Sequence, residues 1–539
     1  MTIFHFLKKE SDKPLLKLGL LTAVSGLSST GVLAVINLAA QGESGKSINI
    51  SYLLMFVAVV GIFITSQKFI LVEGVILIED ILNNLRIRLS DKIRQTDLLN
   101  IEKIGKAKIY NRLTQESALI SQMSVYLITA LQSGIMLIFI FGYIAYLNLM
   151  AAVILLAMLA VGVMLFHKNN IKVYAELDAT NKAEIEYFNS LTDILDGLKE
   201  IKLNRKKSND LFSHYRKIST VVQKLKVSTG YLFSVNTVFS QAFIYIVLGA
   251  IVFVLPQLNA NFSKEIISTT TAMLFAIGPL TSLVSMIPPY EKLNLAVENI
   301  YELEDQLDQH SNHNEVQPID GENRFKNFKR VELKSLYFEY HDNEIYDNFS
   351  IGPIDLTINR GEILFFIGGN GCGKTTLLKA LTMLYNKLDS GSIFVDDKLV
   401  DDTNYLEYRE LYSAIFYDFH LFDKLYGLEN IDPKRVNDLL KLMEIDKKTE
   451  FKEDRFTIQN LSTGQRKRLA LIVTFLEDKP IYIFDEWAAD QDPQFKNYFY
   501  DILLHKLKAE GKTVIAVSHD DRYFHVADRV IKMDYGKIV

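Results

Sequence analysis

The stretch FIGGNGCGKTTLLKAL, residues Phe366–Leu381, decides how the rest of this sequence is interpreted. It contains the pattern G-x-x-x-x-G-K-[ST] from Gly368 to Thr375. The apolar run Glu362–Ile367 before it is typical of a buried strand, and Thr376–Leu384 after it has the pattern of a helix. Such a strand, turn and helix form a loop whose backbone N–H groups converge on an anion. A glycine-rich turn that binds nothing is the alternative, and the flanking elements disfavour it.

Two side chains of this loop are suited to the phosphates of ATP. Lys374 is expected to reach the β- and γ-phosphates, and the Thr375 hydroxyl is expected to bind Mg²⁺. Cys372, the only cysteine of the chain, also lies in the loop, so the chain has no disulfide framework. A redox switch is one interpretation of this thiol, but a tolerated small residue is favoured.

The composition divides the chain into two unlike halves. With 539 residues, it is too long for one ordinary domain. The hydrophobic fraction is 49% and the mean hydropathy is +0.12, but the long apolar runs lie before about residue 290. The later part has the composition of a soluble domain. The net charge of −5 is small and argues neither for nor against nucleic acid. No nucleic-acid partner is expected.

Six apolar stretches in the first half are each long enough to cross the hydrocarbon core of a membrane, which is roughly 30 Å thick. The first is too long for the apolar region of a signal peptide, and further spans follow it. Buried helices of a large soluble protein are the alternative. The predicted spans are Leu15–Ala40, Tyr52–Val72, Val125–Leu147, Leu149–His167, Leu232–Leu255 and Ile266–Ile287.

The distribution of basic residues supports the membrane interpretation. The short connections Gln41–Ile50 and Pro256–Glu265 hold one lysine each, whereas the long connections after the second and fourth spans are rich in lysine and arginine. Because basic connections face the cytoplasm, the long ones are expected on that side. An even number of spans then places both termini in the cytoplasm, where ATP is available.

The long connections have apolar residues at helical spacing, so the spans are expected to continue into the cytoplasm as helical rods. After the sixth span, the apolar periodicity ends near His310. The predicted parts are therefore a transmembrane domain over residues 1–310, a polar linker over 311–325 and a soluble α/β domain over 326–539.

Two further segments of the second half place polar groups after apolar elements. LSTGQRKRLALIVTFLE, from Leu461, is a short turn followed by a helix, with Ser462 as the expected N-cap and Gly464 permitting close approach to an anion. The strand PIYIF ends in two carboxylates, Asp485 and Glu486. Because successive strand residues point to opposite sides, one carboxylate can bind Mg²⁺ while the other deprotonates a water.

A last apolar strand, TVIAV, leads to His519, which is expected to hydrogen-bond the γ-phosphate. Taken alone, this histidine or the two carboxylates would more often be a capped strand end than a catalytic group. Their order after the phosphate loop favours the catalytic interpretation.

The order of these motifs resembles that of ABC transporters of the exporter type, in which membrane and nucleotide-binding domains form one polypeptide. Gly368–Thr375 matches the Walker A motif, Leu461–Gln465 the signature motif, and Ile481–Glu486 the Walker B motif with the catalytic glutamate. Asp492 matches the D-loop aspartate and His519 the switch histidine. The signature is the most specific of these motifs because other P-loop enzymes lack it.

The resemblance implies a six-helix, all-α transmembrane domain of the type IV ABC exporter fold, followed by an α/β P-loop ATPase domain. It implies an ATP hydrolase that uses ATP and Mg²⁺, with Glu486 and His519 as catalytic residues and with Thr375 and Asp485 as metal ligands. The implied ATP contacts are Tyr340, which would stack on adenine, with Gly368, Asn370, Gly371, Cys372, Gly373, Lys374, Thr375, Thr376, Ser462, Thr463, Gly464, Gln465 and Asp492.

Two positions depart from the family pattern. Thr463 replaces the usual glycine of the signature, but it still offers a backbone N–H, so little loss is expected. The Q-loop glutamine is absent, and its position holds Tyr417, followed by Asp418. Asp418 could replace the glutamine as an oxygen ligand of Mg²⁺, or a water could. How this loop would couple the membrane domain to the nucleotide is therefore not predicted.

A single phosphate loop and a single signature imply a homodimer, because this family clamps each ATP between the loop of one subunit and the signature of the other. Two identical composite sites would result. ATP binding would close the nucleotide-binding domains, and hydrolysis would release them. The turns of the cytoplasmic rods, near Glu102–Lys108 and Ala179–Glu186, are the predicted contacts with the ATPase domain.

The cargo is indicated by a narrower resemblance. FFIGGNGCGKTTL, DEWAADQDP and SHDDRYF are similar to a subfamily that exports cyclic peptides, lasso-peptide microcins and siderophores, with Trp487 and Asp490 among the distinctive residues. It implies export of such a peptide or siderophore across the bacterial inner membrane, with an outer-membrane channel as a further candidate partner. A lipid or drug exporter, and a membrane-anchored ATPase regulator that moves no cargo, are the alternatives.

Polar residues within the spans have two possible roles. They either line the path of the cargo or join helices by hydrogen bonds. The residues concerned are Gln132, Ser133, Asn236, Gln241, Thr269 and Thr270.

Overall fold

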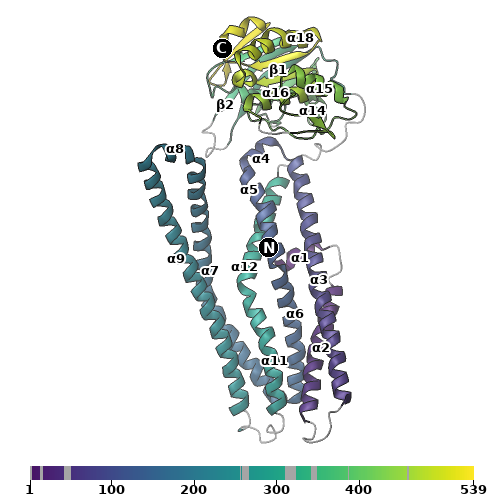
Figure 1. The fold of residues 1–539 in the computed structure, drawn as a ribbon, viewed down its shortest axis with the longest axis vertical. Helices are drawn as coiled ribbons and strands as arrows, with labels where there is room; N and C mark the ends of the chain where they lie inside the picture. Colours follow the sequence, from purple (N-terminus) through teal and green to yellow (C-terminus); the bar gives the residue numbers. More distant parts are fainter. Residues whose placement is uncertain are drawn as a thin grey trace. The chain divides into compact units, whose positions relative to one another are not determined.

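The computed structural model describes residues 3–11, 16–41, 50–254, 257, 266–309, 323–341, 349–386, 388–457 and 461–539. Most of the predicted linker and of the two short connections lies outside these residues. The chain divides into two compact units (Figure 1). One comprises Met1–Leu89 and Ala107–Leu303, and the other comprises Ser90–Lys106 and Glu304–Val539. The second unit therefore combines a short segment from the first half of the chain, Ser90–Lys106, with the C-terminal part.

The first unit is helical throughout the residues that the structure describes. Helices suit a membrane because they satisfy every backbone polar group within one segment. Three helices of this unit, α3, α5 and α12, also reach into the second unit. The helices are α1 (Ile3–Glu10), α2 (Leu16–Gln41), α3 (Ile50–Gln95), α5 (Lys106–Asn111), α6 (Ser117–Leu147), α7 (Leu149–Asp196), α8 (Leu198–Leu203), α9 (Arg205–Gly249), α11 (Ile266–Ser285) and α12 (Ile287–Asp308), with π-helical turns η1 (Arg112–Glu116) and η2 (Ala250–Val254).

Five of the six predicted spans are confirmed by length and composition. Among the described residues, α2, α3, α9, α11 and the helical stretch ending in α6 are long and apolar enough to cross a membrane. The fourth predicted span, Leu149–His167, falls on α7, where the apolar part that the structure describes, Leu149–Met158, is shorter. That span stays a prediction.

The helical rods are also confirmed, because α3 continues to Gln95 and α7 to Asp196 without a break. One predicted turn is wrong. Ala179–Glu186 lies inside α7, and the chain reverses instead at Gly197 and α8, so that α7 and α9 pack side by side (Figure 1). Apolar periodicity indicates a helix but does not say where a long helical hairpin reverses.

Close contacts between α6 and its neighbours hold the helical unit together. A Cβ at Gly26 of α2 would lie 2.6 Å from the ring of Phe139, and one at Gly74 of α3 would lie 2.5 Å from Ile128. Small residues at such crossings let helices approach closely in a membrane. One buried cluster of this unit draws on five helices and comprises Leu33, Leu137, Ile140, Ile144, Ala151, Ala152, Leu155, Val247, Ala272, Met273 and Ala276.

Some polar side chains of the spans join helices. Gln132 on α6 is buried, and its Nε2 donates to Ser25 Oγ of α2 at 2.9 Å and also to Gln67 of α3. Likewise, Asn37 Nδ2 donates to the hydroxyl of Tyr143 at 3.1 Å. For Gln132, the helix-joining role is therefore the one that the structure supports. The other predicted polar residues divide by exposure: Ser133, Asn236 and Thr269 are buried, Thr270 is half-buried and Gln241 is exposed.

The second unit contains two larger sheets and a hairpin. A six-stranded sheet has the order β12–β11–β3–β10–β9–β6 and is parallel except at β12, and an antiparallel sheet has the order β2–β1–β4–β5. The strands are β1 (Arg330–Glu339), β2 (Ser350–Asn359), β3 (Ile363–Ile367), β4 (Ser390–Val395), β5 (Lys398–Leu399), β6 (Tyr412–Ile415), β7 (Phe451–Lys452), β8 (Arg455–Phe456), β9 (Ile481–Asp485), β10 (Thr513–Val517), β11 (Arg529–Asp534) and β12 (Lys537–Ile538).

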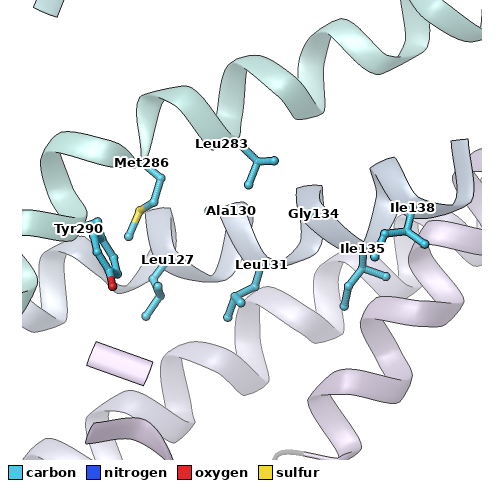
Figure 2. Close-up of a pocket in the computed structure, with 9 residues that line it drawn as sticks. All are labelled: Leu127, Ala130, Leu131, Gly134, Ile135, Ile138, Leu283, Met286 and Tyr290. Carbon is cyan, nitrogen blue, oxygen red and sulfur yellow. The ribbon is translucent and has the colours of Figure 1, made fainter. Parts of the chain in front are cut away.

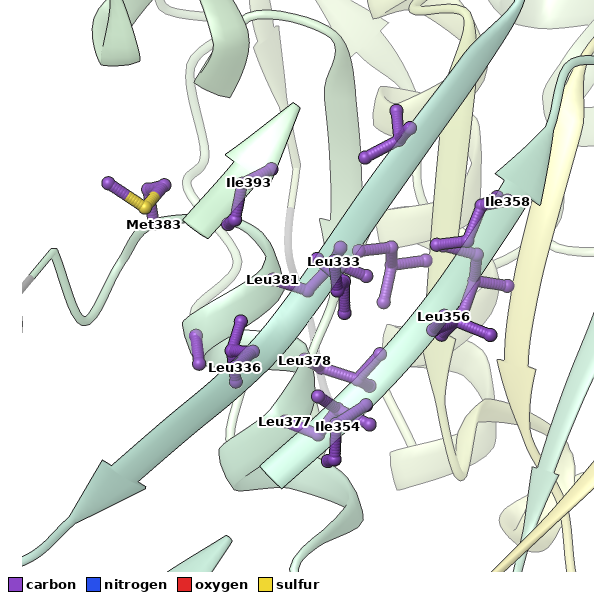
Figure 3. Close-up of a cluster of buried hydrophobic side chains, with 14 of the residues drawn as sticks. Leu333, Leu336, Ile354, Leu356, Ile358, Leu377, Leu378, Leu381, Met383 and Ile393 are labelled. Atoms are coloured by element: carbon purple, nitrogen blue, oxygen red, sulfur yellow. The ribbon is translucent and has the colours of Figure 1, made fainter. Parts of the chain in front are cut away.

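Strand β3 is buried on both faces, as expected of a central parallel strand. Leu364 and Phe366 belong to one hydrophobic cluster, while Ile363 and Phe365 belong to a second. Figure 3 shows part of the first cluster, in which leucines of α13 pack under the antiparallel sheet. The helices of this unit are α4 (Leu98–Ile104), α13 (Lys374–Leu381), α14 (Tyr405–Arg409), α15 (Pro433–Leu442), α16 (Thr463–Glu477), α17 (Pro493–Asn497) and α18 (Leu504–Ala509), with η5 (Trp487–Asp490), η6 (Tyr498–Leu503) and η7 (Asp521–Val526).

Candidate functional site

The predicted strand–loop–helix is confirmed by β3, the loop Gly368–Thr375 and α13. Gly371 and Gly373 have φ angles of +76° and +101°, a region that L side chains rarely adopt. A Cβ at Gly373 would also lie 2.8 Å from Ile351 Cγ2. Glycine is therefore required at position 373 by both conformation and space, and helix α13 begins directly after it.

Lys374 is buried inside the loop that it terminates. Its Nζ donates to the carbonyl oxygens of Gly368 at 3.0 Å and Gly369 at 2.9 Å. These contacts hold the ammonium group at the centre of the loop, where the backbone N–H groups at the start of α13 also favour an anion. The arrangement can bind the phosphates of a nucleotide.

The hydroxyl of Thr375 donates to Asp485 Oδ2 at 2.8 Å. Asp485 is buried at the end of β9, and this burial raises the pKa of its carboxyl, although the hydrogen bond from Thr375 acts in the opposite direction. Magnesium in nucleotide sites takes one or two protein oxygens and completes its coordination with phosphates and waters. This hydroxyl and carboxylate fit that donor set, and no group of three or more metal-binding side chains occurs among the described residues.

Glu486 follows directly after the last residue of β9, and its carboxylate has a different partner from that of Asp485. Its carboxylate Oε1 lies 2.9 Å from His519 Nε2, at the end of the neighbouring strand β10. Glu486 has a left-handed backbone conformation, with φ +50° and ψ +32°. The structure thus brings together the candidate base and a histidine that orients it, on adjacent strands.

A cavity of about 640 Å³ is shared by the phosphate loop, Asp485 and Glu486, whereas His519 lies outside its lining. Its size is typical of small-molecule sites. Tyr340 lines it but is only 6% exposed, and its hydroxyl lies 3.4 Å from Thr376 Oγ1 and 3.3 Å from the hydroxyl of Tyr385. The cavity is lined by Tyr340, Phe349, Asn370, Gly371, Cys372, Gly373, Lys374, Thr375, Thr376, Lys379, Tyr417, Asp418, Asp485 and Glu486.

Phe349 is an aromatic side chain of this cavity that the sequence analysis missed. Its ring lies 6.5 Å from that of Tyr340, at the edge of β2. Its position just before a strand was the available signal. Stacking of Tyr340 on adenine stays a prediction, because most of its ring is covered by neighbouring side chains.

The signature residues do not line the cavity. Ser462 caps α16 as predicted, and it forms a capping box with Gln465, in which each side chain bonds the backbone N–H of the other. Ser462 and Thr463 are exposed. Among the described residues of one chain, therefore, the phosphate loop lines this cavity and the signature residues do not.

Asp492 also lies outside the cavity and caps α17, where it accepts a hydrogen bond from the N–H of Phe495 at 2.9 Å. This bond, together with the charge of Arg468, lowers the pKa of the Asp492 carboxyl. Arg468 is a buried residue of α16 that the sequence analysis did not single out. It ties the signature helix to the segment around Asp492.

The segment that replaces the Q-loop glutamine borders the cavity. Tyr417 is 66% exposed, and its backbone N–H donates a hydrogen bond to Asp485. Asp418 is exposed and lines the same cavity. This placement is compatible with the predicted role of Asp418 as an oxygen ligand, which no contact tests.

Comparison with known proteins agrees with these features. A family model described as ABC transporter matches residues 351–489. The ATP-binding protein SyrD of Pseudomonas syringae pv. syringae is 32% identical over 532 residues, which cover 96% of this chain and 92% of that protein. An ATP-dependent lipid A-core flippase of Paraburkholderia xenovorans is 24% identical over 85% of this chain and 78% of its own.

The fold is similar to that of a solved bacterial Atm1-family ABC exporter with ATP bound. The TM-score is 0.77, and the match covers 99% of this chain and 95% of the other, at 14% sequence identity. The similarity therefore extends over both the helical unit and the two-sheet unit.

Proposed function

This chain belongs to the ABC transporters of the exporter type, with membrane-spanning and ATP-hydrolysing parts in one polypeptide, and we propose that it exports a small peptide across the bacterial inner membrane. The observation that carries the proposal is the paired geometry of Thr375 with Asp485 and of Glu486 with His519. That geometry lies in a chain that also contains at least five helices able to cross a membrane.

The proposed chemistry assigns one role to each group of the cavity. The loop N–H groups and Lys374 hold the phosphates, while Thr375 and Asp485 would hold Mg²⁺, which neutralises developing negative charge when bound. Glu486 accepts the proton of the attacking water, and His519 keeps its carboxylate oriented. Removal of such a base is expected to lower turnover by about 10²-fold or more.

The proposed active form is a homodimer. In one chain, the cavity contains the phosphate loop but not Ser462 or Thr463, which are exposed. A second copy that presents its signature would complete each site. Because Cys372 is buried, the test uses a cysteine-free Cys372→Ser background, in which Asn370→Cys and Ser462→Cys place two exposed thiols on opposite sides of the proposed interface.

In that experiment, oxidation of the protein that carries both Asn370→Cys and Ser462→Cys, in the presence of ATP, is expected to yield a covalent dimer on a denaturing gel. Ser462→Cys alone in the same background is the control, and it should remain monomeric on the gel. Equal cross-linking with and without the thiol at position 370 would contradict the composite site.

The preference for a peptide rests on the resemblance of the phosphate-loop, Walker B and switch segments to peptide exporters. The helical unit contains a cavity of about 400 Å³ between α6 and the α11–α12 region (Figure 2). It is apolar apart from the tyrosine hydroxyl of Tyr290, so we propose that an apolar face of the cargo contacts it. Lipid is the second candidate, favoured by the similarity to lipid A-core flippases.

The first test is ATPase activity of the purified protein in lipid, for the wild type and for Glu486→Gln, with and without cyclic peptides, lasso peptides, siderophores and lipid A. Activity that disappears in the variant and increases with a peptide or siderophore supports the proposal. An increase with lipid A alone favours the lipid exporter. Activity that ignores every compound favours the regulator that moves no cargo.

The cavity of the helical unit can be tested separately by filling it. A Cβ at Gly134, which lines the cavity, meets no atom within 4 Å, and neither does one at Gly142 on the same helix outside it. Gly134→Leu is expected to abolish stimulation by cargo while basal ATPase activity is retained. Gly142→Leu is the matched control and should leave stimulation within about twofold, since surface substitutions away from special features have small effects.

A further inference from the structure

Lys467, on the first turns of the signature helix α16, is a lysine with almost no exposed surface. Its exposed fraction is 1%, which is unusual for this residue type. The ammonium Nζ lies 2.7 Å from Asp490 Oδ2 and donates to the backbone carbonyl of Glu486 at 3.0 Å. A buried ammonium group thus bonds directly to the backbone of the candidate catalytic residue.

That backbone needs support because Glu486 has a left-handed conformation. Non-glycine residues adopt it at a free-energy cost and retain it only where the surroundings impose it. Lys467 and Asp490 brace the turn at both ends, since Asp490 is the last residue of the helical turn η5 that follows Glu486. The contact therefore fixes the direction in which the Glu486 carboxylate leaves the strand.

Further bonds tie the same turn to α16. The indole Nε1 of Trp487 donates to the carbonyl of Lys467 at 2.9 Å, and Gln491 Nε2 donates to the carbonyl of Gly464 at 3.0 Å. The Trp487 bond uses the backbone of residue 467, so it survives any substitution of the lysine side chain. Several bonds therefore join the signature helix α16 to the turn that follows Glu486. Among them, the bond from the Lys467 ammonium group is the one that reaches Glu486 itself.

The position that lacks the family's glutamine also lies beside this lysine. Lys467 Nζ is 5.8 Å from the centroid of the Tyr417 ring, within the range of a cation–π contact. The Lys467 ammonium group thus contacts the backbone of Glu486, the carboxylate of Asp490 and the ring of Tyr417, which occupies the position of the Q-loop glutamine.

We propose that Lys467 is a positioning residue for ATP hydrolysis, which holds the carboxylate of Glu486 in the orientation that accepts the proton of the attacking water. This inference rests on the proposed role of Glu486. Because a displacement of about 1 Å in a catalytic group can cost about 10²-fold in rate, Lys467→Met is expected to lower kcat by about 10- to 100-fold. The KM for ATP should change by less than about threefold, because phosphate contacts are untouched.

Lys512, which precedes β10 and contacts Asp478 at the C-terminal end of α16, provides a matched control. Its Nζ bonds Asp478 Oδ1 at 2.7 Å and the Asp478 carbonyl at 3.3 Å, and it lies 5.9 Å from the ring of Tyr482. These are the same three kinds of contact that Lys467 makes, but far from the carboxylate of Glu486 in the sequence and outside its cavity. Lys512→Met should therefore change thermal stability without lowering kcat.

The decisive measurement compares single turnovers of bound ATP in four proteins: wild type, Lys467→Met, Glu486→Gln and the double variant. If Lys467 acts through Glu486, the double variant should hydrolyse ATP at the rate of Glu486→Gln alone, within about twofold, since residues that act as a unit are not additive. A full additional loss in the double variant would overturn the inference and leave the role of Glu486 intact. Full activity of Glu486→Gln would overturn both.

Should Lys467→Met fail to accumulate in the membrane, Lys467→Gln offers a less disruptive neutral replacement and is judged by the same comparison. An equal loss of kcat in Lys512→Met would also overturn the proposal, because it would show a general effect of losing an ion-paired ammonium group of this unit.

Discussion

Glu102 and Lys379 form an ion pair, with Oε1 and Nζ 2.8 Å apart. Glu102 lies on α4, in the turn after the rod α3, and Lys379 lies on α13, the helix that begins at the phosphate loop. Glu102 Oε2 also accepts a hydrogen bond from the hydroxyl of Tyr385 at 2.7 Å. The predicted contact of the turn near Glu102–Lys108 with the ATPase domain is confirmed, and the carboxylate of Glu102 makes it.

A chain of hydroxyl groups extends this contact to the nucleotide cavity. The hydroxyl of Tyr340 donates to that of Tyr385 at 3.3 Å and lies 3.4 Å from Thr376 Oγ1. Burial and the bonds to Tyr340 and Glu102 raise the pKa of Tyr385, so its hydroxyl stays protonated at working pH. This path reaches the phosphate loop without the missing glutamine.

The first prediction concerns Glu102→Gln and Lys379→Met. Each single variant should lose most of the cargo-stimulated ATPase activity, and the double variant should be no worse than the more affected single one, because both remove the same contact. The measurement is the ratio of stimulated to basal activity in lipid. Lys106→Gln, at an exposed position after the same turn, is the control. Additive losses would mean that the two residues act independently.

This pair should also be insensitive to pH in the working range. Burial lowers the pKa of Lys379, but the hydrogen bond and charge of Glu102 outweigh this effect, and the net pKa is raised. A raised lysine pKa gives a contribution that is present below the unfolded value, about 10.4, and is lost only as pH rises through the folded value. A ratio of stimulated to basal activity that falls between about pH 7 and pH 9 in the wild type would contradict this assignment.

The sequence predicted the phosphate loop, the two carboxylates and the histidine because each lies in a short segment with a fixed order of strand, turn and helix. It did not predict Lys467 as a buried residue, since a lysine on an amphipathic helix is ordinarily exposed. Its burial depends on Asp490, which follows a different strand and meets it only through the tertiary fold. Pairings between distant segments leave no periodic signal in one sequence.

The same limit explains the error in the helical unit. The rods were predictable from apolar spacing, but the turn expected at Ala179–Glu186 lies at Gly197. A long helical hairpin can reverse at any polar point along it, and the pairing of α7 with α9 selects the point. Gly197 itself was the available local signal, since glycine commonly ends helices.

The second prediction concerns the buried carboxyl of Asp485. Its folded pKa is raised, chiefly by burial, so the folded state holds the proton more tightly than the unfolded state. Stability should therefore fall as pH rises from about 4 through the folded pKa, and then level off. In the absence of nucleotide, Asp485→Asn should remove this dependence and raise the unfolding midpoint at neutral pH by about 2–4 °C for each kcal/mol gained.

The measurement is a thermal unfolding series of the full chain in detergent between about pH 4 and pH 8. Asp492→Asn is the control, and its effect on the pH dependence of stability should have the opposite sign. The folded pKa of Asp492 is lowered, so the contribution of this carboxylate to stability is lost as pH falls. Parallel pH curves for wild type and Asp485→Asn would refute the assignment.

The third prediction distinguishes the two middle residues of the signature. A Cβ at Gly464 would lie 2.7 Å from the backbone carbonyl of Asp490, an atom that cannot move aside independently. Gly464→Ala should therefore separate α16 from the catalytic turn, at a cost of about 1–3 kcal/mol in stability, and lower ATPase activity at least tenfold. Thr463→Gly, which restores the usual family residue at an exposed position, should leave activity within about twofold.

The last prediction concerns Asp418 as the replacement for the missing glutamine. Its carboxylate lines the cavity that contains Thr375 and Asp485, and an additional oxygen ligand would increase the affinity for Mg²⁺. In Asp418→Ala, the Mg²⁺ concentration for half-maximal ATPase activity should rise by about fivefold or more, with little change in maximal rate. Asp423→Ala removes another carboxylate of the same segment, outside the cavity, and should have no such effect. If both variants require the same Mg²⁺ concentration as the wild type, a water rather than Asp418 completes the metal coordination. The contact of Glu102 with Tyr385 would then be the main substitute for the coupling role of the Q-loop.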